Sequence, residues 1–284
     1  MIRIKAPAKI NLSLAVIGKQ THFHEVEMVM TTIDLSDYVT VSALPTTDGI
    51  IIKSECPILP LGKSNLVYQA AEQFMEHFNI KSGVEIEVEK HIPIAGGLAG
   101  GSSDAAATFK GLRELFRIDC PDEALCKLGG QLGSDIPFCL IGGTALATGR
   151  GEIITPLKSP PKCWVVIINP RFSASTRDIY DKFRIENADK INTRAMLDAI
   201  ENEDFDEICA RLANNLEPIT TTIFPAINQI KKELYNNGAS GVRMSGSGPT
   251  VFALVYTEKK ANHLYKQMKK VFASYSVYMA RMLG

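Results

Sequence analysis

The most informative segment of this chain is Pro93-Ile94-Ala95-Gly96-Gly97-Leu98-Ala99-Gly100-Gly101-Ser102-Ser103-Asp104-Ala105-Ala106-Ala107. It follows an alternating stretch at 84–88 and precedes apolar residues at helical spacing, so it joins a strand to a helix. Four glycines in the six positions 96–101 are costly in chain entropy for a simple connector. Glycines let backbone N–H groups approach a ligand closely, and the start of the following helix favours an anion. The segment therefore predicts a polyphosphate-binding loop, with a flexible turn as the alternative.

Two familiar phosphate-binding patterns are excluded by spacing. The pattern G-x-x-x-x-G-K-[ST] needs a lysine after its last glycine, whereas Ser102 follows Gly101. The pattern G-x-G-x-x-G fails because Leu98 and Ala99 stand where its second glycine belongs. A second Gly/Ser segment, MSGSGPT at 244–250, lies between two predicted strands. It is either a hairpin turn or a second part of the same phosphate site.

Composition limits the class of protein. The 284 residues suggest about two domains. Lys plus Arg and Asp plus Glu both number 31, and a formal net charge of zero argues against a polybasic nucleic-acid binder. The six cysteines form no C-x-x-C pair, which suits small buried side chains in a reducing cytosol. No signal-peptide pattern or membrane-spanning apolar run of ~18–20 residues is seen. We therefore expect a cytoplasmic protein without nucleic-acid or membrane partners.

Periodicity predicts an α+β protein of two domains, 1–155 and 156–284, divided where Pro, Lys and Ser cluster at 156–161. Asn65 is the expected cap of one helix, and Ser102 or Ser103 of the next. The strands are expected at 1–6, 9–17, 39–43, 50–53, 84–88, 164–168, 242–244, 250–256 and 276–282. Helices are expected at 65–78, 102–116, 122–132, 193–214, 225–237 and 258–272. Strands often follow one another directly, which predicts largely antiparallel sheets.

Local patterns say little about the remaining polar candidates. Lys9 and Asn11 alternate with Ile10, and spacing alone favours a solvated strand face. Asp135 follows Gly-Ser and precedes an apolar run, which is typical of a turn or cap residue. His22 and His24 flank a phenylalanine, and a solvated loop is favoured over a metal site. Neither G-x-S-x-G nor H-E-x-x-H occurs, so hydrolases of those classes lose support.

Taken together, these segments resemble the galactokinase, homoserine kinase, mevalonate kinase and phosphomevalonate kinase superfamily. Residues 93–107 resemble its P-x-x-x-G-L-x-x-S-S-x-A loop, residues 7–11 its first motif and residues 244–250 its third, in the same order along the chain. The phrases at 6–12, 96–107, 133–138 and 149–152 are most similar to members that phosphorylate a cytidine diphosphate-linked alcohol.

The resemblance implies an N-terminal domain like the second domain of ribosomal protein S5, a ferredoxin-like C-terminal domain and an active site in the cleft between them. It implies transfer of the γ-phosphoryl group of ATP to the 2-hydroxyl of 4-diphosphocytidyl-2-C-methyl-D-erythritol, in non-mevalonate isoprenoid biosynthesis. Magnesium would accompany the ATP, and the protein would be a monomer or a homodimer.

The resemblance also implies roles for individual residues. Lys9 and Asp135 would be the catalytic pair, with Asp135 as the base and Lys9 holding it ionised, since a close cation lowers a carboxylate pKa. Asn11 would orient the acceptor alcohol, and Asn65 would contact adenine. Apart from the resemblance, the hydroxyl of Ser103 makes this residue a candidate protein ligand of magnesium. The ATP phosphates would contact Pro93, Gly96, Gly97, Leu98, Ala99, Gly100, Gly101, Ser102 and Ser103.

The cytidine half of the site shows one departure from the family pattern. His24 would read the cytosine edge, Phe23 and Tyr180 would stack on its two faces, and Thr176 would add a polar contact. The family usually has R-x-D-G-Y-H here, whereas residues 19–24 read KQTHFH, which is about one residue shorter and has Phe for Tyr. Two alternatives stay open: a kinase of this fold for another alcohol, such as mevalonate or homoserine, and a catalytically silent nucleotide-binding homologue.

Overall fold

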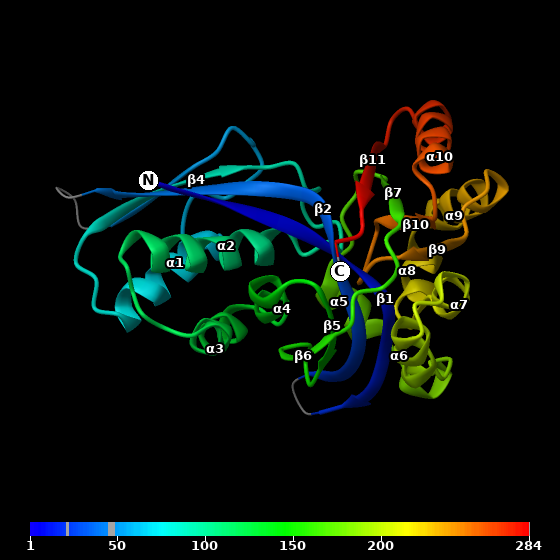
Figure 1. Ribbon diagram of the computed structural model, residues 1–284, viewed down its shortest axis with the longest axis horizontal. Coiled ribbons are helices and arrows are strands. Elements are labelled where there is room, and N and C mark those ends of the chain that lie inside the picture. The colour runs from blue at the N-terminus through cyan, green and yellow to red at the C-terminus, as the bar shows by residue number, and fades with distance from the viewer. Residues whose placement is uncertain (21–22, 45–48, 284) are drawn as a thin grey trace. The chain divides into compact units, whose positions relative to one another are not determined.

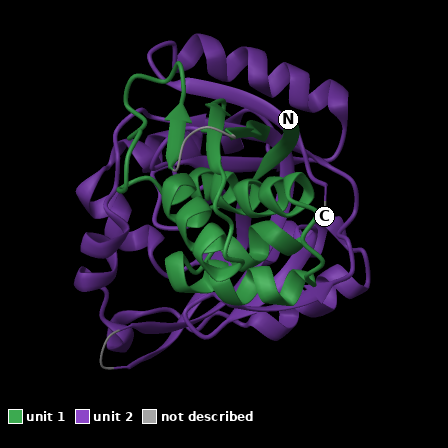
Figure 2. Ribbon diagram, turned by 90° about the vertical axis from the view of Figure 1, so that its left-hand side faces the viewer, with its two compact units in different colours: residues 1–8, 36–92, 99–141 green, residues 9–35, 93–98, 142–284 purple. Residues whose placement is uncertain are grey.

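The computed structural model describes residues 1–20, 23–44 and 49–283 (Figure 1). These residues form two compact units, and each unit draws on several separate segments of the chain (Figure 2). Unit 1 comprises residues 1–8, 36–92 and 99–141, and unit 2 comprises residues 9–35, 93–98 and 142–284. The long strands β1 (Ile2–Lys19) and β2 (His24–Leu44) contribute to both units. The domain boundary expected at residue 156 stays a prediction.

The sheet of unit 1 shows the expected alternation. β2 pairs antiparallel with β4 (Gly83–Glu89), and β4 pairs parallel with β3 (Ile50–Lys53). Along β4 the side chains of Val84, Ile86 and Val88 are buried, and the glutamates between them are not. Because successive side chains of a strand point to opposite faces, one face of β4 packs into the core.

The helices of unit 1 bury aromatic and aliphatic side chains. Helices α1 and α2 pack against each other, and α2 also packs against α4 (Figure 1). Phe74, Phe109 and Leu112 are fully buried, and each such side chain stabilises the fold by about 1.5–3 kcal/mol. The helices of unit 1 are α1 (Leu66–His77), α2 (Gly100–Leu115), α3 (Asp122–Leu132) and α4 (Ile136–Ile141).

Of the two predicted helix caps in unit 1, the cap of α1 is confirmed and the cap of α2 is not. The side chain of Asn65 accepts a hydrogen bond from the N–H of Val67, so the predicted cap of α1 is confirmed. The expected start of α2 at Ser102 or Ser103 is wrong. The backbone N–H of Ser103 donates to the carbonyl of Ala99 at 2.8 Å, which carries the helix back beyond both serines.

The sequence predicted that the first strand ends at Pro7, and this prediction is wrong. β1 runs without a break from residue 2 to residue 19. Proline removes a ladder donor and is accepted where one side of a strand needs none. Among the described residues β8 (Ala213–Asn214) pairs with β1 only at Ser13 and Leu14, so that side of Pro7 requires no N–H.

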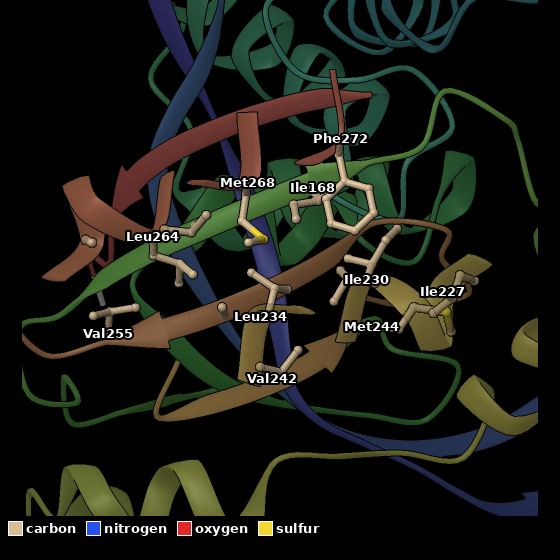
Figure 3. Close-up of a cluster of buried hydrophobic side chains, with 14 residues drawn as sticks. Ile168, Ile227, Ile230, Leu234, Val242, Met244, Val255, Leu264, Met268 and Phe272 are labelled. Atoms are coloured by element: carbon tan, nitrogen blue, oxygen red, sulfur yellow. The ribbon is translucent and has the colours of Figure 1, made fainter. Parts of the chain in front are cut away.

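Unit 2 contains a four-stranded sheet in the order β11-β7-β10-β9, with all neighbours antiparallel. Helices α9 and α10 pack on it and enclose a hydrophobic core (Figure 3). Following the chain, these elements form a β-α-β-β-α-β arrangement, which confirms the expected ferredoxin-like fold. Their bounds are β7 (Trp164–Asn169), α9 (Ala226–Asn236), β9 (Gly241–Met244), β10 (Val251–Val255), α10 (Glu258–Val271) and β11 (Ser276–Arg281).

The remaining elements of unit 2 include a helical stretch that the sequence predicted as one piece. The expected helix at 193–214 ends at Glu201, because Glu203 takes a left-handed φ of 54° and Asp204 caps a new helix. β5 pairs with β2 and with β6. The elements are β5 (Thr144–Thr148), β6 (Ile153–Leu157), α5 (Thr176–Lys182), a 3₁₀ turn (Ile185–Asn187), α6 (Thr193–Glu201), α7 (Phe205–Arg211) and α8 (Glu217–Ile223).

The observed elements confirm the predicted α+β class. Both units combine helices with mainly antiparallel strands. Across residues 1–20, 23–44 and 49–283, no helix combines the length and the apolar character that a membrane span requires.

Candidate active site

The glycine-rich loop has an unusual backbone. Ala95, Gly97 and Ala99 have φ angles of 53°, 77° and 56°, so left-handed residues alternate along the loop. A left-handed alanine costs roughly 1–2 kcal/mol. Backbone strain of this kind concentrates at ligand-binding sites, where alternating conformations turn successive N–H groups toward one concave side. The backbone therefore supports an anion-binding role for this loop.

Two glycines of the loop are required by packing within unit 2. A Cβ atom added to Gly97 would lie 2.2 Å from the carbonyl oxygen of Ser245. A Cβ atom added to Gly96 would lie 2.9 Å from Thr250 Oγ1 and 3.0 Å from Asn169 Nδ2. Real Cβ atoms do not approach other atoms so closely, so larger residues at these two positions would displace the loop.

The other two glycines have more room. A Cβ atom on Gly100 would lie 3.1 Å from Ile92 Cγ2 and 3.3 Å from Lys90 Nζ. On Gly101 it would meet only Leu66 Cδ1, at the ordinary contact distance of 3.7 Å. Packing within the protein therefore does not require a glycine at position 101.

The second Gly/Ser segment contacts the glycine-rich loop within unit 2. The hydroxyl of Ser245 donates to the carbonyl of Gly97 at 2.9 Å. The amide of Asn214 donates to the carbonyls of Met244 and Gly246, both at 2.8 Å, and so fixes the shape of this segment. The segment joins the antiparallel strands β9 and β10, as a hairpin turn would, and it also supports the loop.

Lys9 and Asn11 are buried, so the solvated strand face favoured by spacing is wrong. Their exposed fractions are 4% and 0%. The N–H of Lys9 donates to the carbonyl of Leu98 at 3.1 Å, and Lys9 Nζ donates to Asn11 Oδ1 at 2.7 Å. Asn11 Nδ2 donates to Met28 Sδ at 3.5 Å, and Ser245 Oγ lies 3.5 Å from Asn11 Oδ1. The ammonium group is thus held beside the loop by residues from three segments of unit 2.

Asp135 lies at the turn that leads into α4 in unit 1, as its local pattern predicted. It is half-buried, and its carbonyl accepts the N–H of Cys139 at 3.1 Å. A Cβ atom added to Gly133 would lie 3.9 Å from Ser102 Oγ, so this turn lies close to the start of α2. Because Lys9 belongs to unit 2, the pairing of Lys9 with Asp135 stays a proposal.

The side chains of Ser103 and of Asn65, the predicted adenine contact, already have hydrogen-bond partners within unit 1. Ser103 is 1% exposed, and its hydroxyl donates to the carbonyl of Pro7 at 2.7 Å. Asn65 accepts from Val67 and donates to the carbonyl of Pro60 at 2.6 Å. A hydroxyl and an amide each keep further hydrogen-bonding capacity after these bonds, although both side chains are buried.

Three of the predicted cytidine contacts lie near one another in unit 2. The ring centroids of His24 and Tyr180 are 5.2 Å apart with the planes tilted by 36°. Phe23 is 39% exposed, which leaves its ring available for stacking. Burial, followed by the nearby Lys19 cation, lowers the pKa of His24 below its ordinary value of 6.5. His24 is therefore neutral at pH 7.

The hydroxyl groups of Thr176 and Ser247 are hydrogen-bonded to each other at 2.8 Å, which links the fourth predicted cytidine contact to the second Gly/Ser segment.

Sequence reasoning missed Phe183. This side chain is 4% exposed and meets the ring of His24 edge-on, with centroids 5.9 Å apart. It lies three residues after Tyr180, so both rings contact His24 from the end of α5. That spacing is the signal that would have identified it. His22 lies outside the described residues, and no cluster of three or more His, Cys, Asp or Glu side chains suited to a metal occurs within residues 1–20, 23–44 and 49–283.

Comparison with known proteins gives the family. The model of the GHMP kinases N terminal domain matches residues 65–143, and that of the GHMP kinases C terminal domain matches residues 196–274. The chain therefore belongs to the GHMP kinase family.

Within that family the chain is similar to one kind of kinase along its whole length. It is 48% identical over 284 residues to a 4-diphosphocytidyl-2-C-methyl-D-erythritol kinase of Exiguobacterium sibiricum, covering 100% of this chain and 98% of the relative. It is 46% identical to the kinase of that name from Geobacillus thermodenitrificans, covering 100% of this chain and 97% of the relative. A crystal structure of 4-(cytidine 5'-diphospho)-2C-methyl-D-erythritol kinase superposes with a TM-score of 0.83 at 30% identity, covering 100% of both chains. A homoserine kinase from Cytophaga hutchinsonii shares the fold, with a TM-score of 0.79 at 22% identity over 98% of this chain and 94% of the homoserine kinase.

Proposed function

We propose that this chain transfers the γ-phosphoryl group of ATP to the 2-hydroxyl of 4-diphosphocytidyl-2-C-methyl-D-erythritol. The observation that carries the proposal is the full-length similarity to kinases named for that substrate. The backbone of residues 95–99 and the aromatic group around His24 support the two halves of the reaction, phosphate binding and nucleobase binding.

The ATP half of the proposed site is the glycine-rich loop. The N–H groups of residues 96–103 would donate to the phosphate oxygens, and the first turn of α2 adds partial positive charge. Asn65 would contact adenine through the hydrogen-bonding capacity that its own cap leaves free. The hydrogen bond from Ser245 to Gly97 would keep the loop in shape before ATP arrives, so less ordering is needed on binding.

In the proposed chemical step Asp135 accepts the proton of the substrate hydroxyl. The hydroxyl oxygen then forms a bond to the γ-phosphorus, while the bond from that phosphorus to the β,γ-bridging oxygen breaks and ADP leaves. Lys9 would offset the negative charge that spreads over the moving group, which is the main demand of such a transition state. Asn11 would hold Lys9 Nζ in place through their 2.7 Å hydrogen bond and orient the acceptor alcohol.

The described residues fit magnesium that arrives with ATP. Mg²⁺ usually binds through substrate phosphates and one or two protein oxygens, so the lack of a cluster of acidic or histidine ligands among the described residues is compatible with it. When bound, the ion would neutralise phosphate charge. Ser103 is the proposed protein ligand, because a hydroxyl that donates to Pro7 still has lone pairs.

The cytidine half of the proposed site is the group of aromatic residues around His24. Tyr180 and Phe23 would stack on the two faces of cytosine, and neutral His24 would hydrogen-bond its edge. Thr176 would contact the cytidine moiety from the start of α5. Phenylalanine at position 23 keeps the stacking face that a tyrosine offers and lacks only its hydroxyl.

We further propose that the protein acts in the cytoplasm on small molecules, as a monomer or a homodimer. The six cysteines, which form no C-x-x-C pair, support the cytoplasmic location. Size-exclusion chromatography with light scattering measures the oligomeric state directly.

The test of function is an ADP-release assay with a panel of acceptor alcohols. The proposal predicts turnover with 4-diphosphocytidyl-2-C-methyl-D-erythritol and none above background with mevalonate or homoserine. Turnover with either of the other alcohols would instead indicate a GHMP kinase of different specificity. ATP binding without turnover on any acceptor would indicate a catalytically silent homologue.

A further inference from the structure

A buried ionic cluster lies beside the first residue of α2 in unit 1. Lys90 Nζ donates to Asp104 Oδ2 at 2.6 Å and also contacts Asp37 Oδ2. The exposed fractions of the three side chains are 5% for Lys90, 0% for Asp37 and 1% for Asp104. Burying three ionisable side chains is unfavourable unless they are paired, so a cluster of this kind needs an explanation beyond packing.

The cluster joins the two ends of the loop. Asp37 Oδ1 accepts the N–H groups of His91 at 2.5 Å and Ile92 at 2.8 Å, so it holds the chain just before the loop starts at residue 93. Asp104 follows Ser103 directly, where the loop has become helix α2. Lys90 bridges these two carboxylates. The start and the end of the loop are thus tied to one ammonium group.

The charges of the cluster also matter for an anionic ligand. Lys90 Nζ would lie 3.3 Å from a Cβ atom placed on Gly100, the first residue of α2. This is the turn proposed to bind the phosphates. Burial already raises the pKa of Asp104 to about 7, so without the lysine Asp104 would take up a proton and Asp37 would remain as a carboxylate with no cation beside it. Like charges in a buried site repel strongly, so the lysine reduces the repulsion that a bound phosphate would meet.

We propose that Lys90 is a positioning residue for ATP: it holds the two ends of the phosphate-binding loop together and offsets the negative charge of Asp37 and Asp104. The proposal rests on the proposed binding of ATP at this loop. Lys90 acts through Asp37, Asp104 and the loop backbone, and it makes no contact with the acceptor alcohol in this role.

The test compares Lys90→Met and Lys90→Gln with the wild type. Both remove the positive charge, and the glutamine keeps a polar group for the carboxylates if the methionine variant does not fold. We expect the Kd for ATP, measured by calorimetry on protein that circular dichroism shows to be folded, to rise by about 10- to 100-fold. The KM for the acceptor should stay within about 2-fold.

Two further variants separate this role from a purely structural one. Leu112→Ala removes a fully buried side chain from the same helix, two turns beyond Asp104, and should lower the melting temperature without changing the Kd for ATP. Adding Asp37→Asn to Lys90→Met removes the remaining uncompensated charge and keeps a side-chain oxygen that can accept the N–H groups of His91 and Ile92. The double variant should bind ATP more tightly than Lys90→Met alone.

The results for the Lys90 variants can be told apart from a failure of the proposed ATP-dependent function. If the wild type binds ATP and both Lys90 variants bind it equally well, Lys90 does not position the loop and the inference is wrong. A double variant that is no better than Lys90→Met would overturn the charge argument. A wild type that binds no ATP at all would overturn the proposed function itself, whatever the Lys90 variants do.

Discussion

Replacing Gly101 by alanine tests phosphate binding sharply, because opposite effects are expected on stability and on ATP affinity. Gly101 is exposed in the first turn of α2, and an added Cβ would meet only Leu66 at 3.7 Å. Alanine is a better helix former than glycine and restricts the unfolded chain. The free energy of unfolding should therefore rise by about 0.4–1 kcal/mol, and the melting temperature by roughly 1–4 °C.

The same methyl group should weaken ATP binding. A Cβ atom tilts toward the start of its helix, which is where the phosphates are proposed to lie. N–H to oxygen hydrogen bonds need 2.7–3.2 Å, while a carbon atom is accommodated only at about 3.5–4 Å. Losing one hydrogen bond to a charged phosphate costs about 1.5–3 kcal/mol, so the KM for ATP should rise by about 10- to 150-fold.

Thermal melting by circular dichroism and steady-state kinetics with ATP varied at saturating acceptor measure the two effects. Gly97→Ala serves as the contrasting control, because its Cβ would lie 2.2 Å from the Ser245 carbonyl oxygen at a φ of 77°. That variant should lose both stability and ATP affinity. A Gly101→Ala protein that is more stable and has an unchanged KM for ATP would refute close approach of phosphate to this turn.

Three further predictions concern catalysis and the cytidine half of the site. Asp135→Asn should lower kcat by at least about 10²-fold with ATP binding nearly intact, and near-normal kcat at saturating substrates would remove Asp135 from the mechanism. Phe23→Ala and Tyr180→Ala should each raise the KM for the cytidine substrate by roughly 5- to 150-fold, non-additively and with the KM for ATP unchanged, since stacking is worth roughly 1–3 kcal/mol per base. The pKa of His24 is lowered in the folded protein, so the unfolded chain takes up a proton at this residue more readily. The contribution of neutral His24 to the free energy of unfolding is therefore present above pH ~6.5 and is lost as pH falls through the lowered pKa. The KM for the cytidine substrate should be flat above pH ~6.5 and rise below the lowered pKa, and a His24→Gln variant with the same acid limb would exclude this residue as the cause.

Local sequence patterns predicted most of the secondary structure. The alternating residues 84–88 form a strand with one buried face, and Asn65 caps α1 (Leu66–His77). Such features depend on neighbours within a few residues, so the pattern contains the information needed. The errors occur where distant contacts decide, as at Pro7, where the one-sided pairing of β1 lets the strand continue.

The candidate site was predicted as a set of segments, and its internal contacts were not. The glycine-rich segment indicated phosphate binding from residue types alone, because few other roles explain so many glycines before a helix. Spacing placed Lys9 and Asn11 on a solvated face, whereas both are buried. Alternation tells which residues share a face of a strand. It does not tell which faces other elements cover.

Residue types and their spacing were enough to predict the α+β class, the order of most elements and the glycine-rich loop. The folded chain was needed to show that Gly97 contacts Ser245, 148 residues away, and that Lys90 lies between Asp37 and Asp104. Contacts between distant residues leave no periodic trace along the chain, since each partner's local pattern is compatible with many other neighbours. The charge balance beside the first residue of α2 and the aromatic group around His24 depend on such contacts, and folding brings their members together because burial of the apolar faces selects one arrangement of the strands and helices.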